Sequence, residues 1–324
     1  MENKIDLSKY GMSDEELFTI IKHDDAESEK ITAPRYSYWR SVFRVIFRNK
    51  INWIVLGVLL VLLLLTYVYP QFVTYDRFAH ISDGSAKHLQ PAAAMKKFGN
   101  SISYILGTGA SGEPTFDAMW FGSRISLSLA IVCAIINMTV GVLVGAVWGY
   151  SKKLDLIMTE VRNIIHNIPY ELLIAVLVLV MTRGFWTMVF ALTVTGWLGV
   201  ASFIRTQVII IRDREYNLAS RCLGTPIGRI ATKNILPFMT SVIVTYAALE
   251  VPVYIGFEVY LSYIGLGLSD ITLGRMITES QSAMLVPGWG FEFWSPVAVS
   301  AILSIVLFVV GQNLGDASDP RTHM

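Results

Sequence analysis

Six long apolar runs, separated by polar segments, are the dominant pattern in the chain. A helix needs about 20 mostly apolar residues to cross the hydrocarbon core of a bilayer, because its backbone must satisfy every N–H and C=O group internally. Buried helices of a large soluble protein rarely contain a stretch such as WIVLGVLLVLLLLTYVY. We therefore predict an all-α integral membrane protein with six transmembrane helices, in the runs 51–69, 125–149, 154–181, 185–204, 238–266 and 296–312, the third and fifth of them interrupted.

The composition supports this prediction. Of the 324 residues, 53% are hydrophobic and 16% are charged, whereas a soluble domain has about 25% charged residues. The formal net charge of +1 gives no indication of a nucleic-acid partner. Cys133 lies in an apolar run and Cys222 in a polar segment, and their spacing predicts neither a disulfide nor a metal site.

The distribution of Lys and Arg predicts the orientation. If the N-terminus is cytoplasmic, the inner segments hold 19 of the 26 basic residues, as the positive-inside rule requires. About fifty mostly hydrophilic residues precede the first run, so we expect an uncleaved anchor rather than a signal peptide. We predict a multi-pass protein of the plasma membrane with both termini cytoplasmic. Its regions are a cytoplasmic N-terminal segment (1–50), a first transmembrane helix (51–69), an extracellular loop (70–122), a five-helix core (123–312) and a cytoplasmic C-terminal tail (313–324).

The stretch just before the first run has amphipathic spacing. Arg40, Arg44 and Arg48 recur every four residues, and aromatic and aliphatic residues fill the other faces. This pattern predicts an interfacial helix on the inner leaflet, or equally a plain extension of the first transmembrane helix. Residues 1–34 are polar, and we expect them to be loosely ordered.

The second apolar run carries a row of small residues. Gly141, Gly145 and Gly149 recur every four residues and would lie on one face of a helix. Such a row lets a neighbouring helix approach closely. We interpret it as a packing feature without a functional role of its own.

Polar residues interrupt two of the runs. The third contains HNIPYE, in which Pro169 must bend or break the helix. The fifth contains two carboxylates, and each costs about 3 kcal/mol in the hydrocarbon, so we expect each to face protein or water. The residues at the break either line a cavity or mark the cytoplasmic end of the helix, and each carboxylate either belongs to a functional pathway or has a structural partner; the pattern does not decide between these alternatives. The candidate pathway residues are His166, Asn167, Pro169, Trp197, Glu250 and Glu258.

The polar segment 213–237, between the fourth and fifth runs, contains helix start and stop signals. Asp213 is a good N-cap, and Gly224 is placed to end the helix at the C′ position. Thr225 can cap a second helix with Pro226 at its first position, and Pro237 ends the segment at the membrane. We predict a helix of about ten residues, a sharp corner and a second short helix.

The first of these helices predicts a surface that is both apolar and basic. Tyr216, Ala219, Cys222 and Leu223 lie at helical spacing on one face, and Arg221 lies on the other. A short helix of this kind, attached rigidly to two transmembrane helices, suits docking to a soluble partner. The alternative is an amphipathic pair of helices lying on the inner leaflet.

This segment resembles the EAA loop of ABC-importer permeases, which contains Glu-Ala-Ala, a Gly three residues later and a terminal Leu-Pro. Here LASRCLG supplies Ala219, Ser220 and Gly224, and NILP ends at Pro237. Leu218 replaces the signature Glu. Asn234 replaces a signature Ile. The corner set by the Gly and Pro residues is kept.

Other stretches extend the resemblance over most of the chain. In order, they are similar to the region before the second span of peptide-importer permeases, the end of their fourth span, the end of their fifth span and their C-terminal signature. Gly109 and Pro114 replace two acidic residues of the family pattern. The likeness is to the inner permease subunit of oligopeptide and dipeptide importers, the OppC, DppC or AmiD type of Gram-positive bacteria. The stretches are LGTGASGEPTFDAMWFGSRISLSL, TGWLGVASFIRTQV, FEVYLSYIGLGL and NLGDASDPR.

The resemblance implies a type I importer (MetI-like) fold and a set of partners. These are a second homologous permease, two cytosolic ABC ATPases, an extracellular lipid-anchored binding protein, the peptide and membrane lipid. ATP and Mg²⁺ would bind the ATPases, and this chain would bind no cofactor and no metal. The residues implied at the ATPase contact are Tyr216, Leu218, Ala219, Ser220, Arg221, Leu223, Gly224, Pro226 and Pro237.

Rival functions have less support from the sequence. No Gly is followed by Lys, so the chain has no Walker A loop and cannot supply the energy itself. An intramembrane enzyme would need a motif such as HExxH or GxSxG, and neither occurs. A stand-alone channel or secondary transporter would leave the 213–237 segment unexplained. Within the family, import of dipeptides or of nickel complexes is the alternative to import of oligopeptides.

Overall fold

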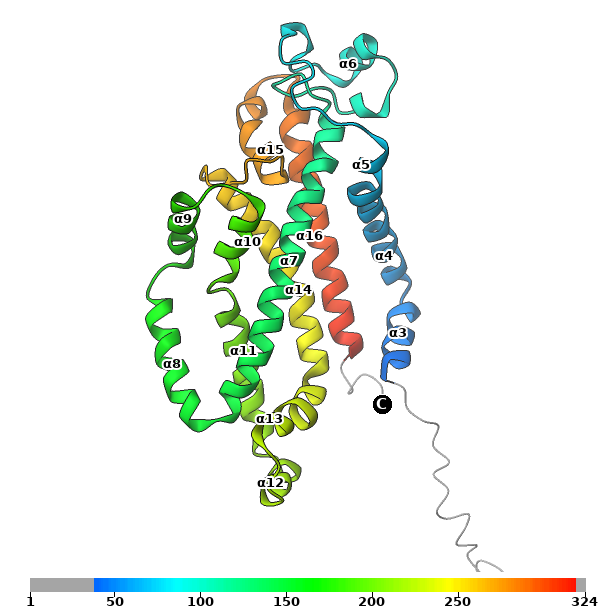
Figure 1. Ribbon diagram of the computed structural model, residues 1–324. Coiled ribbons are helices and arrows are strands. Elements are labelled where there is room, and N and C mark those ends of the chain that lie inside the picture. Colours follow the sequence, from blue (N-terminus) through cyan, green and yellow to red (C-terminus); the bar gives the residue numbers. More distant parts are fainter. Residues whose placement is uncertain (1–37, 319–324) are drawn as a thin grey trace, which may run out of the picture. The chain divides into compact units, whose positions relative to one another are not determined.

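The computed structural model describes residues 38–318, and in this range it is helical with no β-strand. The predicted polar segment 1–34 and residues 319–324 lie outside the described residues. The described residues from Arg40 onward form one compact unit (Figure 1). The α-helices are α3 (Tyr38–Arg48), α4 (Lys50–Leu63), α5 (Tyr69–Phe72), α6 (Pro91–Phe98), α7 (Thr115–Tyr150), α8 (Lys152–His166), α9 (Tyr170–Val180), α10 (Phe185–Thr193), α11 (Trp197–Arg212), α12 (Glu215–Cys222), α13 (Ile227–Arg229), α14 (Thr240–Tyr263), α15 (Leu273–Glu279) and α16 (Gly290–Ser318).

Tighter and wider turns connect some of these helices. A π-helical turn joins α4 to α5, and a second one follows α13. Short 3₁₀ turns lie in the outer loops and before α14. The π turns are Leu64–Val68 and Ile230–Ile235, and the 3₁₀ turns are Gly84–Ala86, Ile102–Tyr104, Leu236–Met239 and Gln281–Leu285.

The predicted six transmembrane helices agree with the structure. Within residues 38–318, five helical stretches are long and apolar enough to cross a bilayer. A sixth span forms if α8 and α9, which meet at an angle of 72°, count as one broken span. The five are Lys50–Phe72, Thr115–Tyr150, Phe185–Arg212, Ile230–Tyr263 and Gly290–Ser318.

Several helices extend beyond the predicted apolar runs. The second span begins at Thr115, ten residues before the apolar run, and the last helix continues to Ser318 through part of the predicted tail. The fifth span is not interrupted, because Pro252 lies inside the continuous helix α14. Neighbouring helices can hold a proline-containing membrane helix together, so the lost hydrogen bond does not break it.

The close approach predicted for the glycine row is confirmed. A Cβ added at Gly141 would lie 2.5 Å from the Val200 Cβ, and one added at Gly145 would lie 2.5 Å from the Ala201 carbonyl oxygen. At Gly149 the added atom would lie 2.7 Å from the Arg205 carbonyl oxygen. α7 and α11 are therefore in backbone contact along three turns, a packing that only small residues allow.

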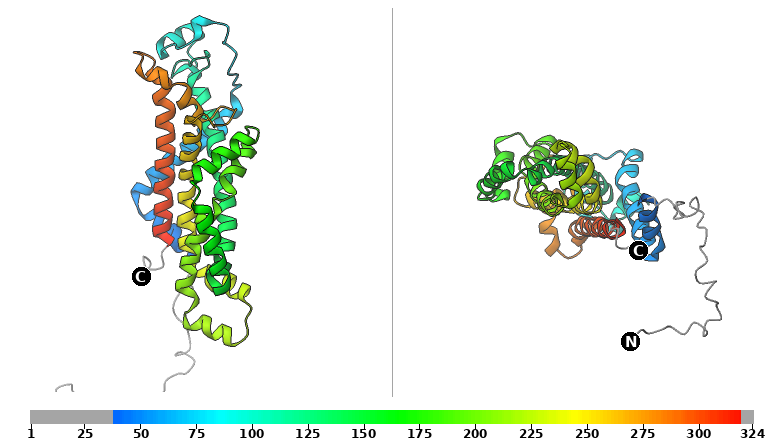
Figure 2. Two further views of the ribbon diagram at one scale, coloured as in Figure 1. Left: turned by 90° about the vertical axis from the view of Figure 1, so that its left-hand side faces the viewer. Right: turned by 90° about the horizontal axis from the view of Figure 1, so that it is seen from below.

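Two hydrophobic clusters form the core. The larger one joins α7, α9, α10, α14 and α16, and the smaller one joins the C-terminal half of α7 and most of α11 to residues 230–239. The outer segment with α6 lies at the same end of the bundle as α15, and α12 lies at the opposite end (Figures 1 and 2). The fold thus places a polar region with α6 and α15 at one end of the bundle and the α12 corner at the other.

Candidate functional site

α12 begins without the side-chain cap that the sequence predicts. The N-cap position is Arg214, whose side chain makes no capping hydrogen bond, so the predicted Asp213 cap is wrong. The Asp213 carboxylate instead pairs with Arg212, with 3.2 Å between Oδ2 and Nε. The reason is the preceding helix, since α11 continues to Arg212 and leaves only two residues before α12.

The end of α12 is the glycine corner that the sequence predicts. Gly224 has φ +76°, a conformation that side-chain-bearing residues rarely adopt. Its N–H donates to the Arg221 carbonyl at 2.9 Å, and the Thr225 N–H donates to the Ser220 carbonyl at 3.1 Å. These two bonds form a Schellman motif, so the predicted C′ role of Gly224 is confirmed.

The second short helix of the 213–237 segment is not a separate element. Helical structure begins at Ile227, one residue after Pro226, and passes through π and 3₁₀ turns into α14. Pro237 lies inside this stretch and does not end it. Ile230 and Ile235 are fully buried in the smaller core cluster, so packing against α7 and α11 carries the helix past the proline.

α12 turns its apolar side chains outward. Asn217 is fully buried, and its Nδ2 donates to the Ile211 carbonyl at 3.0 Å. In contrast, Tyr216, Leu218 and Leu223 are 43%, 44% and 85% exposed. A helix that buries the side-chain amide of Asn217 and exposes its large apolar side chains has a surface suited to binding another protein.

The base of α12 is tied to the end of α7. The Arg221 Nε donates to the Tyr150 hydroxyl at 2.7 Å, and the guanidinium lies 4.7 Å from the centre of that ring. Asn234 donates to the Ser220 hydroxyl at 3.2 Å, and Arg212 donates to the Gly149 carbonyl at 2.8 Å. Arg221 thus holds α12 in place, in addition to any contact with a partner.

A second feature is a cavity of about 340 Å³ between the helix breaks. Its walls come from the α8–α9 break, the turn between α10 and α11, and one face of α14. We call it the intramembrane cavity. Its lining residues are Ile165, His166, Ile168, Pro169, Tyr170, Leu173, Thr195, Gly196, Leu198, Gly199, Val200, Tyr246, Glu250, Val253, Tyr254 and Phe257.

Three of the six candidate pathway residues line this cavity, namely His166, Pro169 and Glu250. Asn167 is exposed at the α8–α9 break but is not part of the wall. The Trp197 indole donates to the Val194 carbonyl at 3.0 Å, which supports the turn before α11.

Glu258 lies in a closed polar cluster away from the cavity. Its carboxylate is fully buried and accepts from the hydroxyls of Ser126 and Ser262, each at 2.9 Å. The Gly274 N–H donates to it at 3.3 Å, and the Thr272 hydroxyl is a further partner. These partners come from α7, α14 and the start of α15, so the carboxylate joins three elements.

The sequence analysis did not predict the aromatic wall of the cavity or the turn between α10 and α11 that lines it. Tyr246 and Tyr254 lie one turn before and after Glu250 on α14, a four-residue spacing that could have indicated one polar face. The fourth apolar run was predicted as continuous, but Thr195 and Gly196 fall in a turn that separates α10 from α11. The Thr-Gly dipeptide at 195–196 was the sequence signal that could have predicted this turn.

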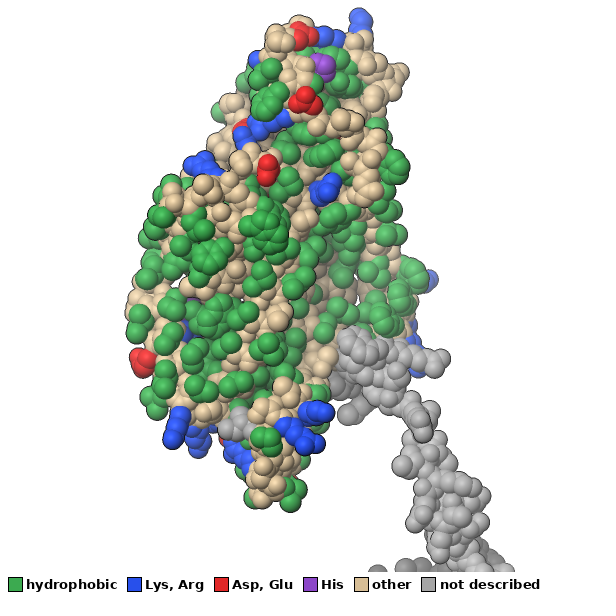
Figure 3. Space-filling view, viewed as in Figure 1, with side chains coloured by type: hydrophobic (Ala, Val, Ile, Leu, Met, Phe, Trp, Pro, Cys, Tyr) green, Lys and Arg blue, Asp and Glu red, His purple; other side chains and the backbone are tan. Residues whose placement is uncertain are grey.

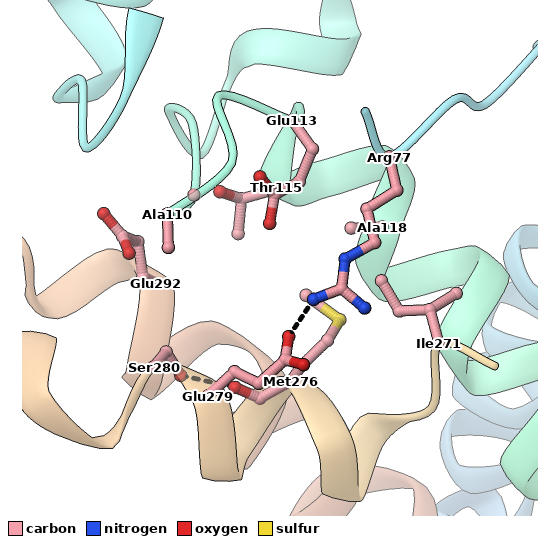
Figure 4. A pocket seen from close by; sticks show the side chains of 11 residues that line it. Arg77, Ala110, Glu113, Thr115, Ala118, Ile271, Met276, Glu279, Ser280 and Glu292 are labelled. Atoms are coloured by element: carbon pink, nitrogen blue, oxygen red, sulfur yellow. Dashed lines mark hydrogen bonds and ion pairs between the residues drawn. The ribbon is translucent and has the colours of Figure 1, made fainter. Parts of the chain in front are cut away.

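The outer end contains a small polar pocket of about 40 Å³ (Figure 4). Arg77 points across it to Glu279, and the two form an ion pair. Burial by itself would raise the pKa of Glu279, but hydrogen bonds from Arg77 and Arg275 outweigh this effect and the pKa is lowered. Glu113 and Thr115 lie across the pocket from Glu279, and burial raises the pKa of Glu113.

A second contact joins the outer loops. The His88 Nδ1 lies 2.8 Å from the Glu292 carboxylate, and the His88 ring stacks on Trp289 with 3.9 Å between centroids. Together with the Arg77–Glu279 pair, this contact connects the segment after α5 with the α15–α16 region. No group of three or more potential metal ligands occurs within residues 38–318.

The surface matches a protein that sits across a bilayer. Apolar side chains cover the middle of the visible face, and Lys and Arg gather at the end that carries α12 (Figure 3). The exposed basic residues at this end include Lys152, Lys153, Arg229 and Lys233. A helical bundle with a broken span, a cavity beside the break and an exposed helical corner at one end is the architecture of a polytopic membrane protein.

Comparison with known proteins identifies the family. Residues 137–324 match the family of binding-protein-dependent transport system inner membrane components, and residues 37–91 match the N-terminal transmembrane domain of oligopeptide transport permease C. The chain belongs to this family as an ABC-transporter permease of the OppC, DppC and AmiD type. It is a membrane permease subunit of the plasma membrane, and the family is not one of enzymes.

Several relatives align over nearly their whole length. The oligopeptide transport system permease protein AmiD of Streptococcus pneumoniae (strain ATCC BAA-255 / R6) is 42% identical, over 96% of this chain and 98% of the relative. The dipeptide transport system permease protein DppC of Bacillus subtilis (strain 168) is 31% identical, over 95% and 93%. The oligopeptide transport system permease protein OppC of the same organism is 30% identical, over 91% and 93%.

Proposed function

We propose that this chain is one of two permease subunits of an ATP-driven importer of oligopeptides. The names of the relatives support a peptide substrate, and the 42% identical relative is an oligopeptide permease. Dipeptides or nickel complexes are the alternative cargo within the family. The chain forms half of the translocation path, with a second homologous permease forming the other half.

In this proposal α12 is the coupling helix that a cytosolic ATPase grips. Its exposed apolar side chains supply the contact, and Gly224 sets the corner that connects α12 to α14. The bonds from Arg221 to Tyr150 and from Arg212 to Gly149 attach α12 to the bundle. A displacement of α12 would therefore be transmitted to α7, α11 and α14 together.

The remaining steps belong to partner chains. A lipid-anchored binding protein delivers the peptide on the extracellular side, and two ATPase subunits bind ATP and Mg²⁺ in the cytosol. Closure of the ATPases turns the permeases outward, and hydrolysis returns them to the inward-facing state. The gathering of basic side chains at the α12 end supports a cytoplasmic location for that end, and we propose that both termini are cytoplasmic as well.

The observation that carries the proposal is the exposure of Leu223 at 85% on a helix anchored by its polar side. We expect Leu223→Glu to reduce co-purification of the ATPase subunits with the permeases, because a charge would have to be buried at the contact. The matched control is Leu285→Glu, since Leu285 is 80% exposed at the outer end. ATPase retention measured after affinity purification should fall only for the inner variant.

The same experiment can contradict the proposal. If Leu223→Glu and Leu285→Glu retain the ATPases equally and support equal peptide uptake in a strain lacking the native gene, α12 is not the contact. If the wild-type chain itself restores no peptide uptake, the proposed cargo is wrong.

A further inference from the structure

The intramembrane cavity has a single acidic side chain in its wall. Among its lining residues, Glu250 is the one acidic side chain, and no Lys or Arg is present. His166 lies at the edge, exposed at the end of α8. A negative group without a fixed counter-charge in the hydrocarbon region is costly. The cavity therefore favours a cationic occupant over a neutral or anionic one.

Aromatic rings surround this carboxylate. Tyr246 and Tyr254 lie one turn away on either side of Glu250 on α14, and Tyr170 and Phe257 complete the wall. The Tyr170 and Phe257 rings meet edge to face, with 5.3 Å between centroids. Faces of such rings attract ammonium groups through their quadrupoles. A carboxylate beside several aromatic rings offers an ammonium ion both charge pairing and contact with ring faces.

Tyr254, which Asn137 fixes in place, is the polar neighbour of Glu250. The Asn137 side chain donates to the Tyr254 hydroxyl, and that hydroxyl in turn bonds to the Glu250 carboxylate. A Cβ added at Gly196 would lie 2.9 Å from the Asn137 Nδ2, so the turn before α11 packs directly on this amide. Tyr254 is the one hydrogen-bond donor that the described residues supply to Glu250, which leaves acceptor capacity facing the cavity.

The size of the cavity limits what can enter it. About 340 Å³ lies at the small end of the range of ligand pockets, which is about 300–1,000 Å³. An oligopeptide does not fit as a whole, but one end of it does. Almost every peptide, whatever its sequence, carries an α-ammonium at one end and a carboxylate at the other, and the α-ammonium is the end group opposite in charge to the Glu250 carboxylate.

We propose that the intramembrane cavity binds the ammonium group of a peptide in transit, with Glu250 as the counter-ion and the Tyr and Phe side chains as the cage. This inference rests on the proposed function, since it assumes a peptide cargo. It explains how a path that accepts many sequences can still contain a charged contact. A Lys side chain carries the same chemistry, so the experiment must separate the two sources.

The first measurement uses a small probe and needs no delivery protein. The full permease–ATPase complex is purified, and its unfolding temperature is measured with butylammonium and with the neutral butyramide. We expect butylammonium to raise the unfolding temperature of the wild type more than butyramide does, because only the cation pairs with Glu250. Glu250→Gln should remove this difference. Glu171→Gln is the matched control, since Glu171 is exposed next to Tyr170 and does not line the cavity.

The second measurement is uptake by cells of three peptides. These are tetra-alanine, its N-acetyl derivative and an N-acetylated peptide with one internal Lys. We expect Glu250→Gln to reduce uptake of tetra-alanine about tenfold, because the peptide ammonium loses its charged partner. Uptake of the N-acetyl derivative, which has no ammonium, should be the same as in wild type. A selective loss with the Lys-containing peptide identifies the side-chain ammonium as the group bound.

Several outcomes would overturn the inference. An equal effect of both probe molecules on the wild type, or a butylammonium effect that persists in Glu250→Gln, removes the ammonium site. Equal loss of all three peptides makes Glu250 a structural residue. If the external binding protein does not deliver the acetylated peptides, the unfolding temperatures with butylammonium and butyramide decide whether the ammonium site exists. Absence of uptake by the wild-type chain contradicts the proposed function instead, and the probe result is still valid.

Discussion

Glu250 and Glu258 lie on the same helix, two turns apart, but they differ in burial and in the number of hydrogen-bond donors around them. Glu258 is fully buried and accepts hydrogen bonds from Ser126, Ser262, Thr272 and the Gly274 N–H. Glu250 is half-buried beside a cavity and has Tyr254 as its donor. The first carboxylate is satisfied within the chain, and the second still has acceptor capacity for a ligand. A carboxylate in a membrane helix is thus structural or functional according to how many donors surround it.

The largest expected effect is at the closed site. Glu258→Ala leaves buried hydroxyl and N–H donors without an acceptor, and each such group costs about 1–3 kcal/mol. We expect a loss of about 3 kcal/mol or more in the free energy of unfolding, seen as a lower unfolding temperature and lower abundance in the membrane. Glu250→Ala should change the unfolding temperature far less. Equal destabilisation by the two variants would contradict the distinction.

The packing around Glu258 gives a second test. A Cβ at Gly274 would lie 2.7 Å from the Val259 Cα and 2.9 Å from the Glu258 Oε1, so Gly274→Ala overpacks the closed site. We expect a cost of about 1–3 kcal/mol. Gly256→Ala is the matched control on α14, the helix that carries Glu258, because nothing lies within 4 Å of its added Cβ. That variant should be neutral or stabilising by up to about 1 kcal/mol. Calorimetry of the two purified variants compares them directly.

Gly224, at the corner after α12, differs from Gly274 because its side-chain space is open and its constraint lies in the backbone conformation. Nothing lies within 4 Å of a Cβ added at Gly224, but its φ of +76° makes a β-branched residue unfavourable. Gly224→Val should cost about 1–2 kcal/mol at the corner and lower the ratio of peptide uptake to ATP hydrolysis. Gly228→Val is the control, since Gly228 lies four residues later with open space and no positive φ. A normal ratio in Gly224→Val would show that the corner geometry is dispensable.

The smallest effect is expected at the outer Arg77–Glu279 pair. The pKa of Glu279 is lowered in the folded state, so the pair stabilises the protein above the unfolded-state pKa. That stability is lost as the pH falls through the lower folded-state pKa. Because the Glu279 side chain is 39% exposed, we expect at most about 1 kcal/mol. Unfolding temperatures of wild type and Glu279→Gln should differ at pH 7 and converge at low pH. A constant difference would exclude the ion pair as its cause.

Much of the fold follows from the sequence alone. The apolar runs are long enough to require helices in lipid, and the row at Gly141, Gly145 and Gly149 requires a close neighbour, which the structure identifies as α11. The corner at Gly224 was also predictable, because the residue after a helix end in this conformation is usually glycine. These features depend on local backbone chemistry, which the residue types fix directly.

The role of each polar residue depended on tertiary structure. Periodicity could not distinguish Glu250 from Glu258, since both are carboxylates in one apolar run, and only the packing of α7 and α15 against α14 surrounds one of them with donors. The same holds for Asp213, which lost its capping role because α11 continues to Arg212. Chain-local signals determine where helices can form and turn. Contacts between distant segments decide which polar groups are satisfied, because a hydrogen-bond partner far along the chain leaves no trace in the spacing of nearby residues.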